Sequence, residues 1–163
     1  MSAPVLDHLI LAASALFDAR RQPSTARLTV HPLPGGPAPD PEALGQLLGE
    51  VWPADAGPIA LNLTSEAWLR ALLDWLERRG VQPHWLIELP AFMLADGATG
   101  DRLATLSSQG QGMVLKGRPL APLSADQLRS FRLAVIDVDE ERRMPGESAP
   151  AGVPRTLPFA QAG

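Results

Sequence analysis

Apolar residues along the chain fall into short continuous runs separated by stripes with helical spacing. The continuous runs cover residues 57–63, 84–89, 112–117 and 133–138. A run without polar alternation is typical of a strand buried on both faces, as in a parallel sheet covered by helices. We therefore predict four such strands in the middle and later parts of the chain.

The segments between these runs predict helices. We expect them over about 41–52, 65–79, 99–108 and 125–131. The second is the best defined, because Thr64 or Ser65 can cap its start, four leucines follow at i, i+3, i+4 and i+7, and Gly80 ends it. Ser124 and Gln127 form the capping box of the last helix. Alternating strands and helices predict a sheet whose parallel strands are joined by right-handed crossovers.

The start of the chain has a different pattern. Two strand-like runs at about 8–14 and 27–33 are separated by a polar segment in which Pro23 and Ser24 suit a loop, so we predict an antiparallel pair. The apolar run 9–17 is too short to span a bilayer and lacks a preceding basic region, and we interpret it as an opening core strand. The fold is then either a doubly wound sheet or part of a (β/α) barrel.

Composition narrows the class of protein. The chain has 163 residues, which suits one domain, and its net charge of −4 gives no basic field for DNA, RNA or an anionic membrane. It contains no Cys, and its three His residues have no metal-ligand spacing, so a cytoplasmic setting without a cofactor is expected. We place an α/β domain at 1–143 and a Pro/Gly/Ala-rich tail or linker at 144–163.

Four strands end alike, with apolar residues running into one polar residue. These polar residues are Asn62, Glu88, Lys116 and Asp137, and Lys116 is the only lysine in the chain. In a parallel α/β sheet the carboxyl ends of the strands share one edge, where ligand sites are built. A simpler explanation is that each strand merely reaches water there, with Lys116 extending into solvent and pairing with nothing.

Two stretches carry a resemblance to a known family. "LNLTSEAWL" followed by "GVQPHWLIELPAFML" resembles the EAL domains of cyclic di-GMP phosphodiesterases, in which an Asn-bearing strand precedes a strand ending in Glu-x-Thr-Glu. The opening "LILAASALFDARRQPSTARLTVHP" is similar to the EAL-type domain found joined to HDOD domains. The order of the later strands fits as well, and the resemblance spans residues 8–139.

The resemblance implies a metal site from which most ligands have been lost. Asn62 and Glu88 match the family's ligand Asn and first Glu of its Glu-x-Thr-Glu, and Asp137 matches the Asp that follows its catalytic Lys. The other positions are changed: the signature Glu falls on Arg27, the second Glu on Ala91, the paired Asp on Lys116 and Gly117, and the catalytic Lys on Val135. Cations at Arg27 and Lys116 would repel Mg²⁺ or Mn²⁺, and one carboxylate with one amide cannot complete the shell of a hard cation. We predict no metal and no hydrolysis, with Lys116 as a tethered counter-ion for Glu88.

The resemblance also implies an incomplete EAL-type barrel. A closed (β/α)8 barrel takes about 200–250 residues, whereas this chain has sequence for about six strands, the first antiparallel. Its edge would be open, or covered by a homodimer, a protein partner or the tail. The chain could be a whole protein or the first domain of an EAL–HDOD protein.

The sequence leaves three functions open, each from a different class of protein. The first is a non-catalytic module that acts through protein contacts in bacterial signal transduction. The second binds cyclic di-GMP or another phosphate ligand without metal, in a vestigial pocket of Arg27, Asn62, Glu88, Lys116 and Asp137, with Arg118 as a further donor. The third, an enzyme of another class with Lys116 or His31 as base, ranks last because no nucleophile triad or phosphate-binding loop is present.

Overall fold

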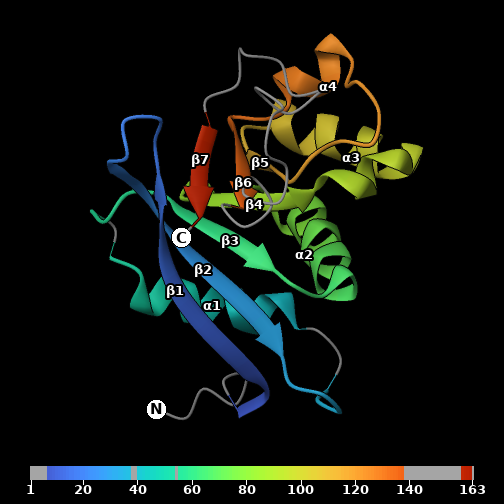
Figure 1. The fold of residues 1–163 in the computed structure, drawn as a ribbon. Coiled ribbons are helices and arrows are strands. Elements are labelled where there is room, and N and C mark those ends of the chain that lie inside the picture. Colours follow the sequence, from blue (N-terminus) through green and yellow to red (C-terminus); the bar gives the residue numbers. More distant parts are fainter. Residues whose placement is uncertain (1–6, 38–39, 54, 138–158, 163) are drawn as a thin grey trace.

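The computed structural model of the chain describes residues 7–37, 40–53, 55–137 and 159–162, and it shows helices packed on the outside of a curled sheet (Figure 1). The strands are β1 (Leu9–Phe17), β2 (Pro23–Pro32), β3 (Ile59–Leu63), β4 (Trp85–Pro90), β5 (Gly112–Lys116), β6 (Leu133–Asp137) and β7 (Phe159–Ala162). The helices are α1 (Pro41–Val51), α2 (Glu66–Arg79), α3 (Gly97–Ser108) and α4 (Ala125–Arg129), with the 3₁₀ helix η2 (Ala91–Ala95) after β4.

The strands follow one another around a barrel in chain order. β1 is antiparallel to β2, and β2 through β6 are parallel. This confirms the predicted α/β barrel of about six strands with an antiparallel first strand, and the doubly wound alternative is wrong because the strand order never reverses. We had left open whether the sheet edge is uncovered or is covered by a homodimer, a protein partner or the tail. In the structure it holds β7, which is parallel to β6 and antiparallel to β1. The tail therefore supplies the cover, while the proposed boundary near residue 143 lies outside the described residues.

The predicted helix caps form as hydrogen bonds. The Ser65 side chain accepts from the Trp68 backbone N–H, and both bonds of the Ser124–Gln127 capping box are present. α3 begins earlier than expected, because Asp96 caps it by accepting from the Ala98 N–H. No helix of the described residues is long and apolar enough to cross a membrane.

The opening hairpin differs from its prediction. β2 already includes Pro23 and Ser24, which we had assigned to a loop, because the Asp18 carboxylate accepts from the N–H groups of Arg20 and Gln22 and tightens the turn. β1 is also less buried than a core strand would be, with residues 10–13 exposed. In Figure 1 the end of the hairpin opposite its turn, where β1 begins and β2 ends, extends beyond the other strands of the sheet.

Two apolar clusters hold the sheet and its helices together. The larger lies between the outer face of the sheet and the helices, and α2 contributes Leu69, Leu72 and Leu76, which are fully buried. The smaller lies inside the barrel and consists of Leu16, Ala60, Leu86, Val114 and Val135. Since side chains alternate along a strand, the inward positions that follow Ala60, Leu86 and Val114 are Asn62, Glu88 and Lys116. The barrel interior thus carries a polar layer at the carboxyl ends of its strands.

Candidate functional site

A buried ion pair stands at the centre of the polar layer. Arg27 donates from Nε to Glu88 Oε1 and from Nη2 to Glu88 Oε2, both at 2.7 Å. The Glu88 side chain is 0% exposed and that of Arg27 is 11% exposed. β2 and β4 hold these residues on either side of β3. This bidentate geometry gives two strong, charge-assisted hydrogen bonds and engages both oxygens of Glu88.

Lys116 belongs to the same layer. Its Nζ donates to Asn62 Oδ1 at 2.8 Å, and Asn62 Nδ2 donates to Thr29 Oγ1 at 3.2 Å. The interpretation in which Lys116 extends into solvent without a partner is therefore wrong. We expected Lys116 to neutralise Glu88, and the structure gives Glu88 a bidentate partner in Arg27.

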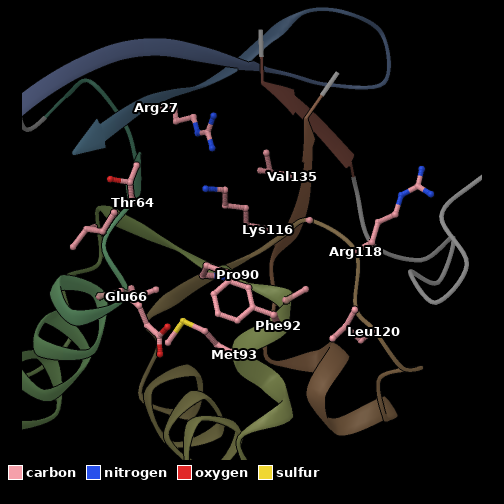
Figure 2. Close-up of a pocket in the computed structure, with 14 residues that line it drawn as sticks. Arg27, Thr64, Glu66, Pro90, Phe92, Met93, Lys116, Arg118, Leu120 and Val135 are labelled. Carbon is pink, nitrogen blue, oxygen red and sulfur yellow. The ribbon is translucent and has the colours of Figure 1, made fainter. Parts of the chain in front are cut away.

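A pocket of about 390 Å³ opens beside these pairs at the carboxyl edge of the sheet. Its lining includes the five changed positions of the resemblance, Arg27, Ala91, Lys116, Gly117 and Val135. Figure 2 shows the Arg27 and Lys116 head groups close together at one end of it. Much of the remaining lining is apolar and includes Leu63, Leu69, Phe92, Met93 and Leu120. Asn62 and Glu88 are buried and do not line the pocket. Arg27 and Lys116 therefore lie between the pocket and the Glu88 carboxylate.

The other charged groups of the lining are Arg118 and Glu66. Arg118 Nε is buried and has no hydrogen-bond partner among the described residues. Glu66 is paired with Arg70 at 2.8 Å, and the hydrogen bond that Arg70 donates to the Glu66 carboxylate is the main reason why the pKa of Arg70 is raised. Arg70 also reaches Asp96, whose pKa is lowered, chiefly by the hydrogen bond from the Thr99 hydroxyl. The acid that lines the pocket is thus paired with Arg70, and the other charged side chains of the lining, Arg27, Lys116 and Arg118, are cations.

The donor set does not fit a divalent cation. Glu88 gives both oxygens to Arg27, and the one oxygen of the Asn62 side chain accepts from an ammonium group. Within the described ranges, no three His, Cys, Asp or Glu side chains gather in a way that could hold a metal ion. Because Mg²⁺ and Mn²⁺ need several free oxygen ligands, we derive no chemical step that uses a metal here.

The predicted site residues are mostly brought together. Arg27, Asn62, Glu88 and Lys116 meet inside the barrel. Asp137 ends β6, where its backbone pairs with that of Ala162, but its side chain lies outside the described residues.

His31 is exposed and does not line the pocket, so it is not placed to act there as a base. We did not predict Thr29, which orients the Asn62 amide. The period-two spacing from Arg27 along β2 could have found it.

Comparison with known proteins gives a result for the fold alone. No protein-family model and no curated protein matches the chain. Among solved structures, the Vibrio cholerae LapD S helix–GGDEF–EAL chain bound to c-di-GMP matches with a TM-score of 0.53 and 13% identity, over 86% of this chain and 43% of that one. Its apo form gives a TM-score of 0.50 and 10% identity, over 82% and 40%. This is an EAL-type fold.

Another solved structure has a lower TM-score and a higher sequence identity. The PaMucR phosphodiesterase, solved as a c-di-GMP complex, is 19% identical over 79% of this chain and 69% of that chain, with a TM-score of 0.49. The chain spans less than half the length of either LapD chain. At these identities the likeness shows the fold alone, including its antiparallel first strand.

Proposed function

We propose that the chain is a non-catalytic EAL-like module that acts through protein–protein contacts in bacterial signal transduction, in the cytoplasm. The observation that carries this proposal is the ion pair between Arg27 and Glu88, which commits the carboxylate retained from the family's metal site to a guanidinium group. The opening of the chain resembles the EAL domains joined to HDOD domains. We therefore expect an HDOD domain to be encoded nearby or in the same protein.

The changed positions support the absence of hydrolysis. The family's reaction uses divalent cations that lower the pKa of a bound water and neutralise developing charge. Here the positions of the second Glu and the catalytic Lys hold Ala91 and Val135, which cannot bind a cation or transfer a proton. Lys116 and Gly117 replace the paired Asp. A pocket with these residues lacks the metal ligands and the proton-transferring group that phosphodiester cleavage in EAL domains needs.

A hydrolysis assay tests this proposal. The native chain is incubated with cyclic di-GMP and Mg²⁺ or Mn²⁺, and the products are separated by chromatography. We expect no linear product above the rate of the protein-free control. Turnover that disappears in the Glu88→Gln variant would contradict the proposal, because it would show that Glu88 still works as a metal ligand.

A specific observation favours a second function, metal-independent binding of a phosphate ligand. Arg27, Lys116 and Arg118 line one pocket, and the buried Nε of Arg118 lacks a protein partner among the described residues. A volume of about 390 Å³ also lies within the usual range of small-molecule sites. Cyclic di-GMP is the first probe to use, since one LapD neighbour was solved with it bound.

Calorimetry distinguishes this second function from the first. If it is correct, cyclic di-GMP binds the native chain with micromolar affinity, equally well with and without EDTA. Lys116→Met then weakens binding by about 10-fold or more, since a hydrogen bond to a charged group contributes about 1.5–3 kcal/mol. Arg129→Met, which removes an exposed cation outside the pocket, serves as the control and should bind like the native chain. No heat with the native chain, or binding only when Mn²⁺ is added, excludes this function.

A further inference from the structure

The strand β1 is apolar and yet exposed. Its nine residues, LILAASALF, include no charged side chain and only one polar residue, Ser14. Ile10 is 54% exposed and Leu11 is 38% exposed, and Ala12 and Ala13 are exposed as well. Because adjacent residues of a strand point to opposite faces, apolar surface is presented on both faces of the same segment.

One edge of this segment has no partner within the described part of the chain. β2 pairs with β1 along its whole length, from Leu9 to Phe17. On the other edge, β7 pairs only with Leu16 and Phe17. The edge from Leu9 to Ala15 therefore continues past the end of β7 without a neighbouring strand among these residues, on the part of the hairpin that extends beyond the sheet (Figure 1).

Natural proteins protect such edges, and this one carries none of the usual protection. Charged side chains, proline and bulges prevent edge strands from pairing with another chain. β1 has no charge and no proline, and its one irregularity lies between Leu16 and Phe17, at the end that β7 already covers. Beyond Val30, where Leu9 and Ile10 pair with Pro32 and His31, β2 no longer pairs with β3. The hairpin has only two strands there among the described residues, so a further strand would stabilise this end.

We propose that a second copy of this chain occupies this edge, with the two β1 strands pairing antiparallel over Leu9–Ala15. Pairing of identical segments in this direction has two-fold symmetry, and the axis passes near Ala12, the middle residue. No like charges meet within the strand. The ends are complementary, because the antiparallel arrangement brings Asp7, before one β1, toward the turn after the other, in which Arg20 and Arg21 outnumber the one acid, Asp18. A parallel arrangement would bring like ends together.

The product is a four-stranded sheet in the order β2, β1, β1 of the partner, β2 of the partner. No residue of β1 lines the pocket described above. The inference deepens the proposed function by naming one protein partner, but it rests on β1 alone and not on the chemistry of the pocket. A chain that proves to bind cyclic di-GMP, or even to cleave it, could pair in the same way.

Sedimentation velocity on the full chain tests the pairing. The native chain is expected to shift from monomer to dimer as its concentration rises. Ala12→Lys and Ala12→Glu each place like charges opposite one another near the axis, so each should weaken the dimer about tenfold or more. An equal mixture of the two variants should restore it. Val51→Lys is the matched control, because Val51 is also an exposed aliphatic residue, at 61%, and lies on α1 away from β1.

Three results would overturn the inference. They are a native chain that stays monomeric at every concentration, a dimer that Ala12→Lys does not weaken, and a mixture of the two variants that fails to associate. If a variant does not fold, hydrogen exchange on the native chain decides instead. Protection of the amides in Leu9–Ala15 must then increase with protein concentration, and protection that is independent of concentration shows that the edge is covered within one chain.

Discussion

Replacement of Arg27 by Met is expected to lower the free energy of unfolding by about 3–5 kcal/mol. The reason is that Glu88, whose side chain is 0% exposed, would lose both of its hydrogen bonds from the guanidinium group and remain as an uncompensated buried charge. Urea denaturation followed by tryptophan fluorescence measures the change.

Two further variants separate this effect from a general loss of packing. The double variant Arg27→Met/Glu88→Gln should recover much of the lost stability, because it leaves no buried charge without a partner. Arg70→Met breaks the exposed pair with Glu66 and should leave the free energy of unfolding nearly unchanged. If Arg27→Met is as mild as Arg70→Met, the ion pair does not have the role that its burial indicates.

Reversal of both cations to acids is expected to create a metal site. The double variant Arg27→Glu/Lys116→Asp would place two new carboxylates beside Asn62 and Glu88. The four side chains would then offer carboxylate and amide oxygens, the donors that Mn²⁺ prefers. A ligand present at 100 times its Kd stabilises a protein by about 2.7 kcal/mol. For a domain of this size, that raises the Tm by about 5–10 °C. Thermal denaturation of the variant with and without MnCl₂ measures the shift.

The control for this experiment removes one proposed ligand. Addition of Glu88→Gln to the double variant should abolish most of the Mn²⁺-dependent shift, while the native chain should show none. A folded double variant whose Tm ignores Mn²⁺ would mean that the changed charges are not what excludes the metal.

Local patterns were sufficient for most of the fold. The start and end of α2 follow from Ser65, its leucine stripe and Gly80, which act within one segment and do not depend on the rest of the chain. β7 could not be found in this way, because FAQA is short and is a strand only by virtue of its pairing with β6 and β1. The exposure of β1 was missed for a related reason: an apolar run predicts a strand but not whether other strands cover it.

The site was predictable in its members but not in its pairing. Strand ends and the EAL resemblance identified Arg27, Asn62, Glu88 and Lys116, because the carboxyl ends of parallel strands meet at one edge. Which cation serves Glu88 depends on the register between β2 and β3 and on side-chain reach across the barrel. Neither is encoded in the spacing of residues along the chain. Phe92 lines the pocket and is 55% exposed, on a 3₁₀ helix that no sequence pattern indicated.

We propose that the cations of this pocket exclude divalent metal from the place that corresponds, in the EAL resemblance, to a metal site. Anomalous diffraction from crystals of the native chain soaked in MnCl₂ tests this claim most directly. We expect no manganese peak within coordination distance of Asn62 or Glu88, with Arg27 still hydrogen-bonded to both oxygens of the Glu88 carboxylate. A peak that bridges Asn62 Oδ1 and the Glu88 carboxylate would contradict it.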